Sequence, residues 1–233
     1  MHILVTNDDG IDAPGLTALV EVARTLGQVI VVAPATHMSG CSHAATTDRP
    51  LRITDHGLSR YSVGGTPVDC VRLAILTIAP QIELVLSGIN DGGNLGVDVL
   101  MSGTVAGARE AVLLGRRAIA ISQYRRRGRR PDWSRSSRFT ATTLAELSRQ
   151  DDSVSCWNVN LPDIEGIETP AIVRCPLDRQ PLPISYQSLG DAFAYTSDYH
   201  GRPRDPASDV AVCFGGRIAV TKLHLPWDTS SQA

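Results

Sequence analysis

The chain has few of the residues that build disulfide frameworks or zinc centres. Its 233 residues include only five cysteines, an odd number with wide spacing and no Cys-x-x-Cys pair. The six histidines form no His-Glu-x-x-His motif. A disulfide-stabilised fold and a zinc hydrolase of that kind are therefore not indicated, and the pattern favours reduced thiols in a cytoplasmic protein.

Long apolar stretches and a strong net charge are also missing. No run is long enough to cross a bilayer, and Met1 leads directly into an apolar segment, so we expect no signal peptide and no membrane partner. The 22 basic and 24 acidic residues leave a net charge of -2. Such a balance provides no general attraction to nucleic acid, so no stable nucleic-acid partner is expected.

What the sequence does contain is a regular alternation of apolar runs and helical patterns. Five runs have the length and composition of buried strands, the last of them closing the sheet: residues 3–5, 29–33, 84–86, 118–122 and 154–159. Segments with helical spacing lie between them, as in residues 16–26 and 105–114. The alternation predicts an α/β fold, a Rossmann-like three-layer structure with a parallel sheet, over residues 1–165.

The last part of the chain differs in composition and in the length of its apolar runs. From residue 166 prolines are frequent and the predicted strands are short, at residues 171–174, 184–186, 209–214 and 217–221. This part has too few apolar residues for a core of its own. We therefore expect residues 166–233 to be a β-rich C-terminal extension that packs on the main sheet or on another subunit, with residues 176–233 forming much of a homo-oligomer interface.

Two adjacent carboxylates, Asp8 and Asp9, follow the first predicted strand. In open parallel sheets, ligands bind just beyond the carboxyl ends of the strands. Neighbouring carboxylates repel and raise each other's pKa, and a divalent cation relieves that repulsion. The alternative is that both residues only form the turn and cap the helix that begins at Pro14, although Asp12 could cap it alone. We favour the cation.

Polar side chains also follow two other predicted strands. Residues 35–47 are rich in hydroxyls and small side chains, and Asn90 offers a neutral oxygen among glycines. Ser102, Gly103 and Thr104 precede a helix and would present hydroxyls and backbone N–H groups to a phosphate. The alternatives are a surface loop with local turns and an ordinary helix cap.

The only strong charge run lies at residues 125–130, which contain five arginines. Most such runs are solvated loops. The other interpretation is a mobile loop near the mouth of the site that attracts anionic substrate.

Taken together, these motifs resemble the survival protein SurE family of metal-dependent nucleotidases. The matching segments are residues 6–15, 32–34, 39–40, 47–51, 65–71, 87–90, 94–96, 102–106 and 158–163, in the order that the family has them. One departure is Asp91, which stands where the family usually has a basic residue.

The resemblance implies a ligand set and an assembly. By position, the metal ligands are Asp8, Asp9, Ser39 and Asn90, and all four supply oxygen to one Mg²⁺ or Mn²⁺ per subunit. The phosphate and substrate contacts fall on Asn94 and on residues 102–104, namely Ser102, Gly103 and Thr104. The C-terminal extension is implied to mediate a homo-dimer or homo-tetramer.

The resulting hypothesis is a metal-dependent phosphomonoesterase that hydrolyses nucleoside 5′- and 3′-monophosphates. Asp8 or Asp9 would orient or deprotonate the attacking water. Two rivals stay open. An aspartyl-phosphate phosphatase also places aspartate after its first strand, but with one residue between the two carboxylates. A non-catalytic nucleotide-binding module would bind the nucleotide without hydrolysing it.

Overall fold

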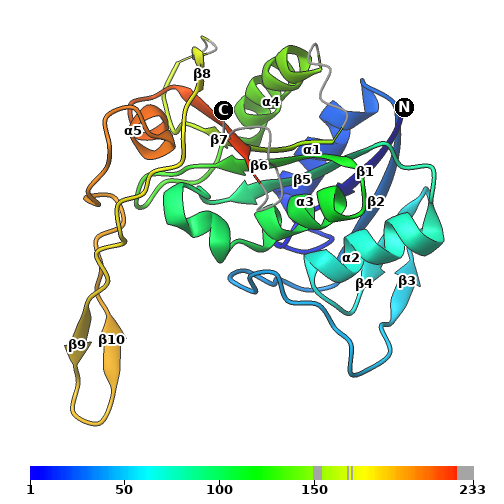
Figure 1. Cartoon of the computed structure of the whole chain (residues 1–233), viewed down its shortest axis with the longest axis horizontal. Helices are drawn as coiled ribbons and strands as arrows, with labels where there is room; N and C mark the ends of the chain where they lie inside the picture. The colour runs from blue at the N-terminus through cyan, green and yellow to red at the C-terminus, as the bar shows by residue number, and fades with distance from the viewer. Residues whose placement is uncertain (149–153, 167, 169, 225–233) are drawn as a thin grey trace, which may run out of the picture.

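The computed structural model describes residues 1–148, 154–166, 168 and 170–224. Nine strands form one sheet in the order β3-β4-β2-β1-β5-β6-β7-β11-β8, and β9 and β10 form a separate hairpin (Figure 1). The strands are β1 (His2–Thr6), β2 (Gln28–Pro34), β3 (Ile53–Asp55), β4 (Arg60–Val63), β5 (Leu84–Asp91), β6 (Arg117–Gln123), β7 (Cys156–Leu161), β8 (Ile172–Arg174), β9 (Tyr186–Ser188), β10 (Phe193–Tyr195) and β11 (Ile218–Leu223).

The central part of the sheet is parallel, as predicted. The strands from β4 through β2, β1, β5 and β6 to β7 all pair in parallel, and the chain builds outward from β1 in both directions. The strand order therefore reverses at β1, between β2 and β5. In open α/β sheets this reversal leaves a crevice at the carboxyl ends of the strands, where ligands bind.

Helices cover both faces of the sheet and complete the three layers (Figure 1). One face packs against α1 (Pro14–Arg24) and α4 (Trp133–Leu147), and the other against α2 (Pro67–Leu73) and α3 (Gly103–Leu113). A π-helical turn, η1 (Ala74–Ile78), continues α2, and a 3-10 turn, η2 (Gly96–Leu100), precedes α3. Thr66 caps α2 in a reciprocal pair of hydrogen bonds with Asp69.

The C-terminal part joins the main sheet, and two predictions for this region are wrong. Residues 154–159 do not close the sheet, because β11 pairs antiparallel with β7 and β8 lies beyond β11. Residues 209–214 form a helix, α5 (Asp209–Phe214), and not a strand. A short apolar run fits either structure, and here the Ser208 side chain accepts a bond from the Ala211 N–H and begins the helix.

Buried ion pairs and hydrogen bonds tie the extension to the core. Arg202 is 2% exposed and its guanidinium lies 2.8 Å from the Asp98 carboxylate in η2. The Asp209 carboxylate accepts hydrogen bonds from the backbone N–H groups of Gly96 and Asp178. In this structure the C-terminal segment therefore contacts the main sheet through β8, β11 and these bonds. Its last residues, 225–233, lie outside the described part of the chain.

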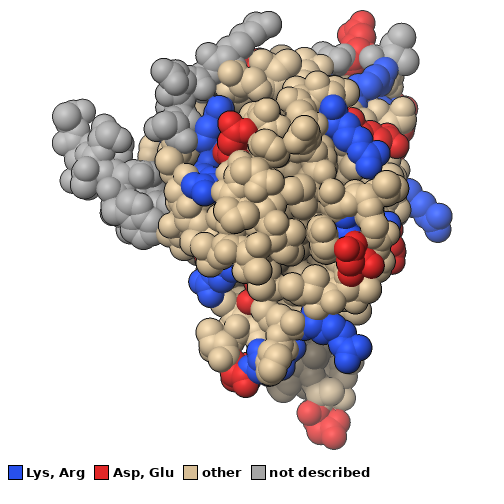
Figure 2. All heavy atoms as spheres, turned by 90° about the vertical axis from the view of Figure 1, so that its right-hand side faces the viewer, with Lys and Arg blue, Asp and Glu red and all other residues tan. Residues whose placement is uncertain are grey.

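The β9–β10 hairpin projects away from the body of the molecule (Figure 1). Its aromatic side chains Tyr186, Phe193 and Tyr195 are 62%, 70% and 59% exposed. On the face drawn in Figure 2, basic and acidic side chains are interspersed among uncharged residues. Within the described residues, no helix is long and apolar enough to span a membrane.

Candidate active site

The turn that follows β1 is made by Asn7. Its side chain accepts a hydrogen bond from the Gly10 N–H and donates one to the Gly10 carbonyl. Helix α1 begins after Ala13 without any side-chain cap, and Asp12 instead forms an ion pair with Arg60 at 3.0 Å. Asp12 therefore does not cap α1 as suggested, and Asp8 and Asp9 have no capping role either.

Asp8 is buried at the end of β1, with 3% of its surface exposed. Its Oδ1 accepts a short hydrogen bond, 2.5 Å, from the Thr104 hydroxyl at the start of α3. Burial raises the pKa of Asp8 to about 6, the Thr104 hydrogen bond works against that rise, and the negative charge of Asp9 adds to it. The fold thus holds a carboxylate where its charge is costly unless a cation accompanies it.

Asp9 lies beside Asp8 and is more open to solvent. Its Oδ2 accepts a hydrogen bond of 3.1 Å from the backbone N–H of Asp91, at the end of β5. Its Oδ1 lies 3.4 Å from the Nδ1 atom of His37, which follows β2. Burial raises the pKa of Asp9, whereas the Asp91 N–H and His37 oppose the rise. Residues from three strand ends therefore meet at Asp9.

Asn90 reaches the same edge because β5 is irregular near its end. The register of β5 against β6 shifts between Ser87 and Asn90. At Gly88, φ is +143° and a Cβ atom would lie 2.2 Å from the Ile121 carbonyl oxygen, so only glycine fits there. The Asn90 amide nitrogen donates to the Gly92 carbonyl at 2.8 Å, which leaves its side-chain oxygen available to a ligand.

The hydroxyl-rich segment, residues 35–47, is held across the strand ends. Its Met38 N–H donates to the Asp8 carbonyl oxygen at 2.7 Å, which places the next residue, Ser39, against the end of β1. Farther along, the Ser42 N–H donates to the Met101 carbonyl. Ser39 itself is exposed. The segment is thus fixed to the site and is not a free surface loop.

The first turn of α3 forms the opposite side of the Asp8 carboxylate. Ser102 caps the helix by accepting the Val105 N–H at 3.0 Å. A Cβ atom on Gly103 would lie 2.9 Å from Asp8 Oδ2 and from the Cys41 sulfur. Gly103 and Thr104 therefore lie directly against the carboxylate.

Asn94 lies farther from the carboxylates, in a buried polar network. Its N–H donates to Asn160 Oδ1, and its carbonyl accepts from the amides of Asn158 and Asn160. Its own amide donates to the Ser122 hydroxyl at 2.8 Å. Within the described residues, no hydrogen bond joins Asn94 to Asp8 or Asp9. The structure thus places Gly103 and Thr104 against Asp8, and it places the residues next to Ser39 and Asn90 against Asp8 and Asp9, whereas Asn94 lies in a separate network.

The donor set fits a hard divalent cation. Asp8, Asp9, Ser39 and Asn90 all supply oxygen at one edge of the sheet, and Asp8 Oδ2 makes no hydrogen bond to a described residue. The described residues contain no group of three or more histidine, cysteine, aspartate or glutamate side chains that could hold a metal ion. A cation held by these four residues would have only oxygen ligands from the protein, a set that suits Mg²⁺ or Mn²⁺ better than zinc.

Known proteins resemble this chain along nearly all of its length. The family model "Survival protein SurE" matches residues 3–180. A protein of a Nostoc species is 48% identical over 227 residues, which span 97% of this chain and all of that protein. The chain belongs to the SurE family.

Other SurE relatives extend the likeness to the whole chain. The protein named "5'-nucleotidase SurE" of Pelobacter propionicus is 38% identical over 239 residues, covering 97% of this chain and 94% of its own length. The crystal structure of the SurE protein from Aquifex aeolicus is 30% identical and has a TM-score of 0.89. The alignment of the two structures covers 99% of this chain and 96% of the Aquifex chain.

This SurE chain has site neighbours that the sequence did not reveal. His37 contacts Asp9, and no motif marked it as a site residue. Glu110, 2% exposed on α3, accepts hydrogen bonds from His43 at 2.8 Å and from Arg72 at 2.5 Å. Although burial alone would raise the pKa of Glu110, these two partners hold it below its usual value. Glu110 thereby ties the hydroxyl-rich segment to α3, and only its helical position among apolar residues hinted at its burial.

A cavity of ≈ 460 Å³ opens beside Asp9, and we name it the Asp9 cleft. Its lining includes Asp9, His37, Asp91, Arg125, Arg130 and Trp133. Arg125 forms an ion pair with Asp91 at 3.0 Å. Arg125 thus brings positive charge next to the acidic Asp91, which stands where the SurE family usually has a basic residue. The run of arginines therefore begins and ends at the mouth of the site.

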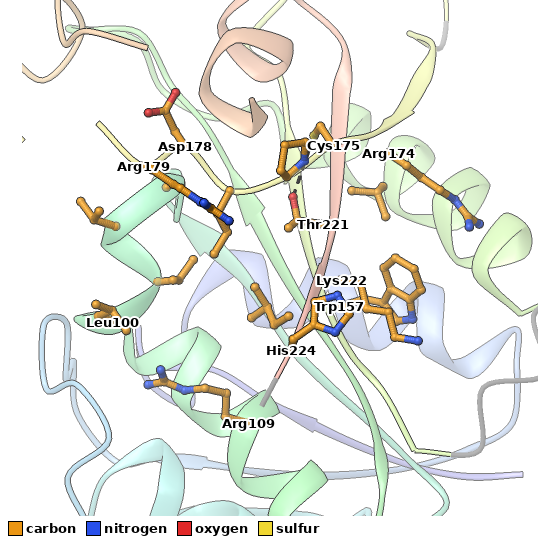
Figure 3. Close-up of a pocket in the computed structure, with 17 residues that line it drawn as sticks. Leu100, Arg109, Trp157, Arg174, Cys175, Asp178, Arg179, Thr221, Lys222 and His224 are labelled. Carbon is orange, nitrogen blue, oxygen red and sulfur yellow. Dashed lines mark hydrogen bonds between the residues drawn. The ribbon is translucent and has the colours of Figure 1, made fainter. Parts of the chain in front are cut away.

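A larger cavity, ≈ 860 Å³, lies between η2, α3 and the end of β11 (Figure 3). Its wall includes Arg109, Trp157, Arg179 and His224. None of the eight predicted site residues lines it. We refer to it as the β11 cavity, and it is separate from the carboxylates of the SurE site.

Proposed function

We propose that this SurE protein is a metal-dependent 5′-nucleotidase that hydrolyses nucleoside 5′-monophosphates to nucleoside and phosphate. The observation that carries the proposal is the pair of carboxylates at the end of β1. Asp8 is buried and accepts a hydrogen bond from the Thr104 hydroxyl, and the adjacent Asp9 is partly open to solvent. Relatives of 38% identity that are named "5'-nucleotidase SurE" support the reaction class. Action on 3′-monophosphates is part of the proposal as a second activity.

Asp8, Asp9, Ser39 and Asn90 would hold one Mg²⁺ or Mn²⁺. A bound cation of this kind supplies charge that stabilises the phosphoryl oxygens and lowers the pKa of a bound water. The chain supplies the rest of the site. The first turn of α3, with Gly103 at its start, offers N–H donors to the phosphate oxygens. Thr104 holds Asp8 in place through its hydroxyl.

Asp9 is the better placed of the two carboxylates to orient or deprotonate the attacking water. Its side chain is 12% exposed, whereas Asp8 is enclosed and already accepts the Thr104 hydroxyl. His37 lies 3.4 Å from Asp9 Oδ1 and favours the charged carboxylate. An ionised Asp9 can accept a proton from water, and a hydrogen bond to its other oxygen from the Asp91 N–H fixes its orientation.

A phosphate-release screen tests the function. The protein is incubated with the 5′- and 3′-monophosphates of each nucleoside and with Mg²⁺, Mn²⁺ or Ca²⁺, and EDTA serves as the control. We expect phosphate release from 5′-monophosphates that EDTA abolishes. Nucleotide binding without release under every metal would show a binding module. A phosphorylated adduct trapped on Asp8 or Asp9 would show an aspartyl-phosphate enzyme.

We also propose that the protein forms a homo-dimer or homo-tetramer through its C-terminal extension, in the cytoplasm. The exposed aromatic side chains of the β9–β10 hairpin are the supporting observation, because apolar surface of this kind usually contacts a partner. Deleting residues 184–196 should reduce the mass measured by light scattering to that of a monomer. An unchanged mass would place the interface elsewhere. Cys41, Cys70, Cys175 and Cys213 are free thiols, which supports the proposed reducing compartment.

A further inference from the structure

The Asp9 cleft has a feature that the phosphate chemistry does not use, the indole ring of Trp133. Trp133 is the first residue of α4 and lines the cleft together with Asp9. The ring is half-buried and packs against the apolar cluster that includes α1. One part of an aromatic side chain is therefore anchored in the core, while another part borders the cavity that Asp9 also lines.

The ring position depends on Gly15 in the first turn of α1. A Cβ atom at Gly15 would lie 2.9 Å from two atoms of the Trp133 ring and 2.0 Å from the Ile89 carbonyl oxygen. Glycine is thus required for α1, α4 and β5 to approach one another this closely. The contact holds the indole in one place before any ligand arrives, which lowers the entropic cost of binding against it.

The charges of the cleft suit a ligand that is neutral beyond its phosphate. The guanidinium of Arg125 is already paired with Asp91 at 3.0 Å. Arg130 lines the same cleft and forms no ion pair with a described residue, so its N–H groups are available to acceptor atoms. The cavity of ≈ 460 Å³ falls within the usual range of small-molecule sites, roughly 300–1,000 Å³.

We propose that the Asp9 cleft receives the nucleoside half of the substrate, with its base stacked on Trp133. This inference rests on the proposed nucleotidase function. It identifies the part of the site that selects the nucleoside, which is the leaving group of the reaction. Stacking on an indole grows with the area of the ring laid against it, so purine monophosphates should bind more tightly than pyrimidine monophosphates. Arg130 donates hydrogen bonds to acceptor atoms of the base or ribose. Trp133 is a specificity-determining residue and takes no part in the bond cleavage.

The test compares Trp133→Leu with Trp133→Phe. Leucine fills apolar space without a flat aromatic face, and phenylalanine keeps such a face. Each variant is assayed on AMP, on CMP and on glycerol 2-phosphate, which carries a phosphate but no ring. Trp157→Phe, in the β11 cavity, is the matched control for the loss of an indole, and the melting temperature of each variant is measured.

We expect Trp133→Leu to raise KM for AMP roughly tenfold and KM for CMP less, with kcat within about twofold of the parent. KM for glycerol 2-phosphate should stay within about twofold, and Trp133→Phe should retain most of the AMP affinity. Unchanged KM for AMP in Trp133→Leu would overturn the inference, and so would equal losses on AMP and glycerol 2-phosphate. If the parent released phosphate from glycerol 2-phosphate but from no nucleotide, the proposed function itself would fail.

Discussion

The two cavities of the molecule differ in size and in chemistry, and the smaller one lies at the predicted site. The β11 cavity, at ≈ 860 Å³, exceeds the Asp9 cleft, at ≈ 460 Å³. The carboxylate that lines the larger cavity, Asp178, is already occupied by hydrogen bonds from Gln180, Asp205 and Ser208 within the extension. The Asp9 cleft, in contrast, is lined by the Asp9 carboxylate at the end of β1. The charged side chains of Asp91 and Arg125 line the same cleft, and His37 lies beside Asp9.

Position in the sheet, and not volume, sets the Asp9 cleft apart from the β11 cavity. The reversal of strand order at β1 brings the carboxyl ends of β1, β2 and β5 together, and their side chains converge there. The β11 cavity lies where β8 stops pairing with β11 at Val220, so it arises from the end of a short edge strand. Substitutions in the Asp9 cleft and in the β11 cavity should therefore have different effects on activity.

The largest effect is expected from removing charge at the site. Asp8→Asn and Asp9→Asn should each lower kcat/KM by at least about 100-fold, since losing a partner of a metal ligand already costs roughly 10–100-fold. The melting temperature without metal should hold or rise, because one of two repelling carboxylates is gone. Phosphate release, metal affinity by calorimetry and melting curves provide the measurements.

Ser39→Ala and Asn90→Ala are the matched controls for these two variants. Each removes a neutral oxygen that water partly replaces, so their losses should be smaller. If both aspartate variants bind metal and turn over like the parent, the active site lies elsewhere. If they lose activity only because they unfold, the turn-forming interpretation of Asp8 and Asp9 returns.

A smaller but sharp effect is expected at Gly103. A Cβ atom there would lie 2.9 Å from Asp8 Oδ2, so Gly103→Ala should displace the carboxylate and lower kcat on the order of 100-fold. Alanine in a helix is otherwise favourable by up to about 1 kcal/mol, so stability should not fall greatly. Gly107→Ala, one turn along α3, is the control, because its nearest contact is the Ser87 hydroxyl at 3.3 Å. Equal activity in the two variants would contradict the placement of Asp8.

The arginine run should have a modest effect that depends on salt. Arg126 and Arg127 are exposed. Changing both to serine should raise KM roughly two- to threefold at low ionic strength, and less at high salt where charges are screened. The control is Arg129→Ser, because Arg129 is already paired with Asp163 and Glu165. The same KM at every salt concentration would favour a solvated loop without a steering role.

The smallest effect is expected in the β11 cavity. Arg179 is exposed and lines that cavity away from the carboxylates. Arg179→Ala should leave kcat and KM within about twofold of the parent, as surface substitutions outside a site usually do. A large loss of activity would show that the two cavities are coupled and that the β11 cavity is not separate from the site at Asp9.

Much of the fold could be predicted because its signals are local. The apolar runs at β1, β2, β5 and β6 end in polar residues, and the helical spacing between them requires parallel crossovers. The segment that became α5 was misassigned because its five consecutive apolar residues, 210–214, fit a strand or a helix equally well. The antiparallel pairing of β11 with β7 involves residues about 60 positions apart in sequence, and no local pattern specifies it.

The candidate site divides in the same way. The adjacent carboxylates and the cap at Ser102 could be recognised because each depends on neighbouring residues. The contact of Asp9 with the Asp91 N–H spans 82 residues, and the contacts of His37 and Glu110 also cross between elements. Asn94 stays a predicted substrate contact, and its bonds to Ser122, Asn158 and Asn160 were not foreseen from the sequence.

The sequence by itself therefore determined the layers, the polar strand ends and the pair of carboxylates, because apolar periodicity and turn chemistry act over a few residues. Only the tertiary structure decided which strands became neighbours, how deeply Asp8 is buried and which cavity lies against Asp9. Those properties come from packing between distant segments, where burial shifts a pKa and a missing Cβ at Gly15 or Gly103 sets the approach of one element to another.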